Sequence, residues 1–313
     1  MFRINRIGTN TDWEKLELID TGSDLRVVLV PGAGAILNEL WVKGVNVVDG
    51  YKGRKDFNER VHSGFRSAKL SPFVCRLLDA SYTWQGETYR LDKFMLGESS
   101  LHGILYDMNF DVIREKQGTE NCSVSMRYQY DGKHPGYPFP FNCTVTYELE
   151  KDQKLNIKTH LSNPAGAKSA IPIVDGWHPY FKLGGKVNDW WLQIASDQMM
   201  EYDDKLIPTG NYLLNEYFSN GRTIGTMNLD NGFRLREGIS PICILKNPGN
   251  GLSIQFLSQQ NYPFLQLYIP GDRESIAIEN LSGAPDAFNN GIGLSVLQPG
   301  DKMDLAVQFQ VCG

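Results

Sequence analysis

Apolar and polar residues alternate strictly along several long segments of this chain of 313 residues, and this alternation restricts what it can fold into. Apolar side chains occupy every second position of residues 122–130 and of residues 143–149, and a polar turn at 151–154 leads into another alternating run. Residues 305–311 repeat the pattern. Successive side chains of a β-strand point to opposite faces, so each run is typical of a half-buried strand. The pattern predicts antiparallel hairpins and meanders.

Amphipathic helical patterns are scarce, and the best is a turn or two within residues 56–64. Without helices to cover a parallel sheet, sheet must pack on sheet. Hydrophobic residues make up 41% of the chain and charged residues 21%, which is enough to form a sizeable core. Gly and Pro punctuate the strands throughout rather than marking a linker. We therefore expect an all-β fold, one large antiparallel β-sandwich with few short helices, as a single domain over residues 1–313.

The charge of the chain limits its partners. The net charge is −5 and Lys and Arg form no run, whereas nucleic acids and anionic membranes require a concentrated basic surface. The N-terminus lacks the apolar run of a signal peptide, and no segment approaches the roughly 20 apolar residues that span a bilayer. We expect a small-molecule ligand, no nucleic-acid or membrane partner, and a protein that stays in the cytoplasm.

Five cysteines are scattered along the chain without the close pairing typical of zinc sites or of a disulfide framework. They are Cys75, Cys122, Cys143, Cys243 and Cys312. This usage also favours a reducing cytoplasm. Cys122 and Cys143 fall on the apolar side of alternating runs, so we interpret them as small core residues.

The segment 176–183, with the sequence GWHPYFKL, is a candidate wall for a sugar pocket because it holds His178 beside a proline and between aromatic residues. A carboxylate can stand opposite. Glu279 lies in a strand-like run where alternation places it on the same face as Ser275 and Ala277. A base and an acid across a cleft can move protons on a hemiacetal. The alternative for His178 is a core histidine that is hydrogen-bonded to a backbone carbonyl.

Three further residues are candidates, each with a structural alternative. His102 precedes Gly103, which tolerates unusual backbone conformations, and could instead be a turn histidine with local hydrogen bonds. Arg76 is a lone cation among apolar residues, and it could simply pair with Asp79. Asp230 begins an Asp-Asn-Gly sequence, and local chemistry alone predicts that it forms a turn.

Short motifs occur in a characteristic order from about residue 20 to the C-terminus. They are residues 71–76 (SPFVCR), 82–91 (YTWQGETYRL), 101–103 (LHG), 136–138 (GYP), 178–183 (HPYFKL), 207–210 (IPTG), 279–289 (ENLSGAPDAFN) and 297–301 (LQPGD). Each motif alone is weak, but in this order they resemble the aldose 1-epimerase (mutarotase) family. One departure is Cys75, where the family usually has Asn, and a thiol lacks the hydrogen-bonding capacity of an amide.

The resemblance implies a β-sandwich of the galactose mutarotase type and interconversion of the α and β anomers of free hexoses such as glucose or galactose. It implies that Glu279 is the base that takes the proton of the C1 hydroxyl and that His178 is the acid that protonates the ring oxygen. His102, Arg76 and Asp230 would bind the monosaccharide. No cofactor and no metal would be needed, and the protein would be a monomer or a weak homodimer.

Three other functions remain open. A hexose-6-phosphate 1-epimerase on the same fold would need extra cations at the mouth of the cleft, for which Arg66, Lys69 and Arg222 are candidates. A glycoside hydrolase would use Asp230 and Glu279 as its carboxylate pair.

A non-catalytic carbohydrate-binding protein is the third alternative. Such a protein would stack sugars on exposed tryptophans, for which Trp177, Trp190 and Trp191 are candidates.

Overall fold

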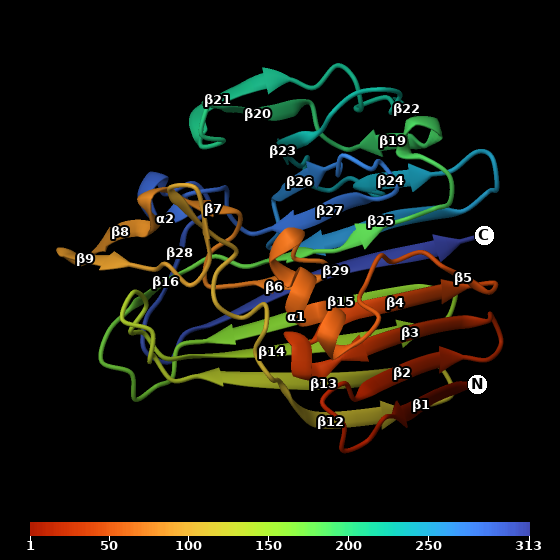
Figure 1. Ribbon diagram of the computed structural model, residues 1–313, viewed down its shortest axis with the longest axis horizontal. Helices are drawn as coiled ribbons and strands as arrows, with labels where there is room; N and C mark the ends of the chain where they lie inside the picture. The colour runs from red at the N-terminus through yellow and green to blue at the C-terminus, as the bar shows by residue number, and fades with distance from the viewer.

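The computed structural model describes residues 1–313, and most of its regular structure is antiparallel β-strand (Figure 1). The largest sheet has nine strands. In spatial order these are β12 (Asp111–Gln117), β13 (Asn121–Tyr130), β14 (Phe141–Glu150), β15 (Lys154–Ser162), β29 (Lys302–Cys312), β25 (Ser253–Gln260), β24 (Cys243–Lys246), β19 (Trp191–Ile194) and β22 (Arg222–Thr223). The long alternating runs of the sequence form β13, β14, β15 and β29, so the prediction that these runs are strands is confirmed.

A second large sheet has eight strands and carries the site described below. Its path runs β21 (Pro208–Leu214), β20 (Gln198–Tyr202), β23 (Asp230–Arg234), β26 (Phe264–Tyr268), β27 (Ile276–Leu281), β17 (Gly176–His178) and β6 (Ala68–Leu70), and β18 (Tyr180–Phe181) also pairs with β27. Asp230 therefore begins a strand, and the turn predicted from Asp-Asn-Gly is wrong. Pairing of β23 with β26 overrides the local preference of these residues.

Smaller sheets complete the fold. They consist of β1 (Phe2–Ile7), β2 (Lys15–Asp20), β3 (Leu25–Val30), β4 (Ile36–Val42) and β5 (Val45–Asn46); of β10 (Met95–Leu96), β11 (Ser99–Leu101) and β7 (Arg76–Leu77); of β8 (Ser81–Trp84) and β9 (Glu87–Arg90); and of β16 (Ile171–Ile173) and β28 (Ser295–Leu297). The α-helices are α1 (Arg54–Arg60) and α2 (Ala287–Asn290). Helix α1 and the 3-10 turn that follows it (Val61–Ser63) cover most of residues 56–64, for which the sequence predicts a turn or two of helix. Neither α-helix is long and apolar enough to span a membrane.

The core lies between the sheets. The back of the eight-stranded sheet packs on the nine-stranded one through aromatic side chains: the ring of Phe181 lies 5.7 Å from that of Phe256 and 6.1 Å from that of Phe309. The Trp177 ring lies 5.8 Å from Tyr147 in β14. The five-stranded sheet covers another part of the nine-stranded one through contacts of β1 and β2 with β13. Sheet packs on sheet, as the scarcity of helices predicts, and the other face of the eight-stranded sheet is left free to bear a site.

Candidate active site

The register of three neighbouring strands places His178, Glu279 and Gln266 in one row on the free face of the eight-stranded sheet. Strand β17 pairs with β27 so that Gly176 is opposite Leu281, and continuing this antiparallel register puts His178 opposite Glu279. On the other side of β27, Gln266 is opposite Glu279. Side chains of directly opposed residues are neighbours, and the His178 Nε2 and Glu279 Oε1 atoms lie 3.3 Å apart.

A second row lies two residues along the same strands. Tyr180 is opposite Ala277, Ala277 is opposite Tyr268, and Tyr268 is opposite Asp230. Residues two apart on a strand share a face, so this row lines the same side as the first. The rings of Tyr180 and Tyr268 stand edge to face with 6.4 Å between their centres, on either side of the small Ala277. Alternation therefore put Glu279 and Ala277 on one face, as the sequence predicts.

Two loops from the N-terminal third of the chain, around Cys75 and His102, complete the wall of the site. The backbone N–H of His102 donates to the Cys75 carbonyl at 2.9 Å, and β7 pairs Arg76 with Leu101 of β11. Cys75 and His102 both have positive φ, +49° and +62°, which non-glycine residues adopt at a cost. Gly103 follows in the same region, and a Cβ there would lie 2.2 Å from the backbone oxygen of Ser71. The His-Gly sequence thus holds an imidazole in a tight crossing of two loops.

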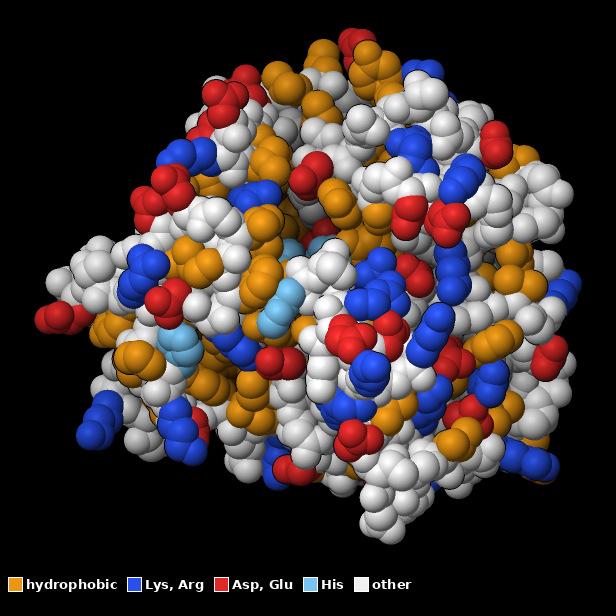
Figure 2. Space-filling view, in the orientation of Figure 1, with side chains coloured by type: hydrophobic (Ala, Val, Ile, Leu, Met, Phe, Trp, Pro, Cys, Tyr) orange, Lys and Arg blue, Asp and Glu red, His pale blue; other side chains and the backbone are white.

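All five residues predicted to form the site line one cavity of about 310 Å³, a volume in the range of small-ligand sites. These residues are Arg76, His102, His178, Asp230 and Glu279. The space-filling view shows a hollow with histidine and acidic side chains at its base (Figure 2). No group of three or more His, Cys, Asp or Glu side chains is arranged to hold a metal ion.

Burial governs the protonation of the His178–Glu279 pair. Glu279 is only 2% exposed, and its burial, together with the nearby charge of Asp230, raises the pKa of its carboxyl well above the usual value. Burial also lowers the pKa of His178 to about 3. Both shifts favour the neutral forms, because a charge loses its hydration in such a site. The His178 Nδ1 and Glu279 Oε2 atoms have no hydrogen-bond partner in the protein.

His102 stands next to His178, with the two rings edge to face and 5.0 Å between their centres. Its other face packs at 4.5 Å against Phe65. Burial lowers the pKa of His102 well below the usual value, and the charges of His178 and Arg76 act in the same direction. Its Nδ1 atom has no partner, so a turn histidine satisfied by local hydrogen bonds is not what the structure contains.

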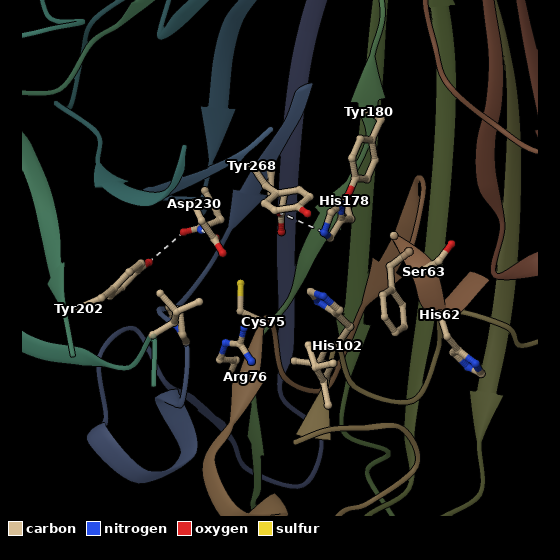
Figure 3. Close-up of a pocket in the computed structure, with 18 residues that line it drawn as sticks. His62, Ser63, Cys75, Arg76, His102, His178, Tyr180, Tyr202, Asp230 and Tyr268 are labelled. Carbon is tan, nitrogen blue, oxygen red and sulfur yellow. Dashed lines mark hydrogen bonds and ion pairs between the residues drawn. The ribbon is translucent and has the colours of Figure 1, made fainter. Parts of the chain in front are cut away.

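Arg76 is half-buried and forms no ion pair, with Asp79 or with any other carboxylate. The close-up shows its guanidinium on the cavity wall, below the Cys75 sulfur, which points toward Asp230 (Figure 3). Burial raises the pKa of Cys75 well above the usual value, and Glu279 and Asp230 add to the rise. The site thus contains an unpaired cation beside a neutral thiol.

A hydrogen-bonded chain that sequence reasoning missed fixes Asp230. The Tyr202 hydroxyl donates to Gln266 Oε1 at 2.8 Å, and Gln266 Nε2 donates to Asp230 Oδ1 at 2.7 Å (Figure 3). Burial raises the pKa of Asp230. A signal for Gln266 exists in the sequence, because this amide alternates with Leu265 and Leu267 and so faces away from them. Tyr202 gives no comparable local signal.

The structure corrects the candidates of two alternative functions. Lys69 is fully buried and pairs with Asp175 on the core side of the sheet, and Arg222 is exposed on the edge strand β22, so neither lines the cavity. Alternation along β6 explains why Lys69 points into the core. Its neighbour Ala68 lies opposite His178 on the cavity face, so Lys69 points to the other face. Arg66 does not line the cavity directly but lies behind its wall.

The tryptophans proposed as stacking platforms are not exposed. Trp177 and Trp190 are buried in the core, and Trp191 is half-buried. Trp177 is adjacent to His178 on its strand and therefore points to the opposite face.

Comparison with known proteins agrees with the fold. The family model described as aldose 1-epimerase matches residues 17–310. The chain is 25% identical to the Escherichia coli protein YihR, with 85% of this chain and 84% of YihR covered, and 24% identical to a Streptococcus thermophilus aldose 1-epimerase, with 96% and 92% covered. A galactose mutarotase-like protein from Clostridium acetobutylicum superposes with a TM-score of 0.86 at 18% identity, covering 100% of this chain and 99% of the other.

Proposed function

The chain belongs to the aldose 1-epimerase family, and we propose that it interconverts the α and β anomers of a free aldose by opening and closing the sugar ring. The observation that carries the proposal is the His178–Glu279 pair, whose Nε2 and Oε1 atoms lie 3.3 Å apart in the cavity. An acid and a base so placed can act on the hydroxyl and the ring oxygen of one hemiacetal, which are bonded to the same carbon.

In the proposed reaction, the Glu279 carboxylate takes the proton of the C1 hydroxyl while protonated His178 gives its proton to the ring oxygen. The bond between C1 and the ring oxygen breaks, and C1 becomes an aldehyde. Rotation about the C1–C2 bond presents the other carbonyl face. The C5 hydroxyl then attacks C1 and returns its proton to His178, while Glu279 returns its proton to the new C1 oxygen. The reaction consists of proton transfers and of the breaking and re-forming of one C–O bond, so the proposal invokes no cofactor.

The electrostatics of the pair suit these roles. A carboxylate whose pKa is raised is a stronger base, and an imidazolium whose pKa is lowered is a stronger acid. Moving one proton from Glu279 to His178 converts the neutral pair favoured by burial into the ionised pair that starts the reaction. Sugar hydroxyls that hydrogen-bond to the carboxylate would stabilise that ionised form.

The remaining predicted residues would bind the sugar. The Nδ1 atom of His102 has no hydrogen-bond partner in the protein, the guanidinium of Arg76 has no ion-pair partner, and Gln266 donates a hydrogen bond to Asp230. Charged side chains form strong hydrogen bonds to hydroxyl groups, which suits Arg76 and Asp230 to ring hydroxyls. Cys75, as a neutral thiol, would contribute contact more than hydrogen bonding.

Polarimetry on freshly dissolved α-glucose and α-galactose tests the proposal, and the protein should speed the relaxation of optical rotation for at least one of them. Glu279→Gln keeps the size of the side chain but removes the base, so the rate constant kcat should fall by about 10²- to 10⁴-fold. Glu274→Gln, at an exposed glutamate that pairs with Lys186, is the matched control and should keep its rate. A folded Glu279→Gln protein with nearly wild-type rates would refute the assignment.

A further inference from the structure

The direction of the Arg76 side chain depends on its backbone, because no carboxylate of the protein pairs with its guanidinium. The strand that carries it, β7, has only two residues, and Cys75 and Asp79 near its two ends have positive φ of +49° and +52°. This left-handed conformation is costly for residues other than glycine, so such a backbone persists only where its surroundings hold it. The contacts around β7 therefore decide where the guanidinium points in the cavity.

Two neighbours hold this short strand. The first is β11, in which Leu101 is opposite Arg76. The second is Asp286, whose backbone N–H donates to the Arg76 carbonyl at 2.7 Å and whose Oδ1 atom accepts a hydrogen bond from the Leu78 N–H at 3.0 Å. Asp286 thus holds the segment at two points, one through its main chain and one through its side chain.

Asp286 is itself fixed in place. It is only 5% exposed, and its φ of +60° is a conformation that Asp and Asn tolerate better than most other residues. Asn289 of α2 donates from Nδ2 to the same Oδ1 atom at 2.8 Å and to the Ser81 carbonyl at 2.9 Å. The carboxyl oxygen that holds the Leu78 N–H therefore has a second donor that orients it.

This anchor belongs to the segment that follows the proposed base. Asp286 lies seven residues after Glu279, and Pro285 between them lines the cavity. Figure 1 shows α2, which begins directly after Asp286, beside β7, and the two elements are in contact. The chain that leaves β27 thus passes along the wall of the cavity and reaches the strand that carries Arg76.

We propose that Asp286 is a positioning residue that holds the backbone of Arg76 so that the guanidinium meets the hydroxyl groups of the bound sugar. The inference rests on the proposed function, which assigns Arg76 to the sugar. Asp286 does not itself line the cavity, so it acts through Arg76. Charge-assisted hydrogen bonds require a definite geometry, and a misplacement of about 1 Å in a site can cost about 100-fold.

Two substitutions separate the carboxyl group from the backbone conformation. Asp286→Gly keeps the positive φ without strain but removes the acceptor for the Leu78 N–H, whereas Asp286→Asn keeps an acceptor oxygen and tolerates the conformation. Polarimetry would use the faster of glucose and galactose at several concentrations. KM should rise by about tenfold in Asp286→Gly while kcat changes less, because Arg76 would bind substrate and transition state alike. Asp286→Asn should restore KM to within about threefold of the wild type.

Asp152→Gly is the matched control. Asp152 also has a φ of +60°, but it is exposed in the turn between β14 and β15, so its substitution should leave KM unchanged. Urea unfolding is measured on the same proteins. A role of Asp286 in stability alone would lower the free energy of unfolding of Asp286→Gly and leave KM as it is, and this result would contradict the inference.

A protein without the Arg76 side chain gives the sharpest comparison. In Arg76→Ala, Asp286→Gly should raise KM no further, because the effect passes through the guanidinium. If Asp286→Gly does not fold, Asn289→Ala, at an exposed residue, weakens the same anchor and should raise KM by a smaller factor, and only when Arg76 is present. An unchanged KM in the variant that folds, or an equal rise with and without the Arg76 side chain, would overturn the inference and leave the proposed function standing. Acceleration of no sugar by the wild-type protein would overturn both.

Discussion

Gly232→Ala tests whether the hydrogen-bonded chain from Tyr202 through Gln266 to Asp230 holds the carboxylate that we propose binds the sugar. Gly232 lies opposite Gln266, and a Cβ there would lie 2.3 Å from the Tyr202 hydroxyl oxygen and 3.2 Å from Gln266 Oε1. Carbon and oxygen atoms make unstrained contacts near 3.5 Å, so the hydroxyl must withdraw by about 1 Å. That movement breaks its 2.8 Å hydrogen bond to Gln266.

The loss of this hydrogen bond has a definite size. A buried hydrogen bond whose partner is left unsatisfied costs about 1–3 kcal/mol, so urea unfolding of Gly232→Ala should show a loss of that order. Asp230 would bind substrate and transition state alike, so KM should rise by about tenfold while kcat changes less. Polarimetry at several sugar concentrations separates the two constants.

Tyr202→Phe supplies the comparison, because phenylalanine lacks the hydroxyl oxygen, the nearest atom that the new methyl group would strike, while the contacts at 3.0 Å with Met200 Sδ and at 3.2 Å with Gln266 Oε1 are present in both backgrounds. Gly232→Ala should therefore cost much less stability in the Tyr202→Phe protein than in the wild type, as a double-mutant cycle measures. If the alanine costs the same in both backgrounds, the collision is not with the hydroxyl and the reasoning fails.

Two other predictions concern buried charges. The pKa of His178 is about 3 in the folded protein and about 6.5 in the unfolded chain, so the unfolded chain binds its proton first as the pH falls, and the free energy of unfolding should decrease from pH 6.5 toward pH 3. Urea unfolding at pH 7 and pH 5 should show a smaller decrease for His178→Asn, and an equal decrease in both proteins would contradict the shift. Lys69→Met leaves Asp175 as an uncompensated buried charge and should cost about 3–5 kcal/mol in urea unfolding. Adding Asp175→Asn should restore part of this stability, and no restoration would mean that the pair is not coupled.

The strands of the nine-stranded sheet could be predicted from sequence because their signal is local. In β13, β14 and β29, one face meets the core and the other meets solvent, and the burial patterns alternate accordingly. The functional strand β27 is different, since all six of its residues are buried. One face of β27 meets the core and the other meets the cavity. The polar residues of this strand therefore mark the face that lines the cavity, not a face exposed to solvent.

The individual residues of the candidate site could be predicted from the sequence, but their arrangement in space could not. His178 and Glu279 meet because β17 and β27 pair in one register, and no local pattern specifies which distant strands pair. The turn predicted at Asp230 is wrong for the same kind of reason, because pairing of Asp230 with Tyr268 of β26 holds this residue in a strand. That residues 1–313 form one domain and that the protein is a cytoplasmic monomer or weak homodimer stay predictions.

The placement of the proposed acid and base on adjacent strands determines which changes of chain length the protein can absorb. The long stretch between His178 and Glu279 reaches the cavity mainly through its strands, so insertions in loops away from the cavity would leave the two proposed reacting groups face to face. One residue added to or removed from β27 ahead of Glu279 would turn the carboxyl into the aromatic interior. Homologues should therefore diverge in loop length while keeping the count of residues along these strands.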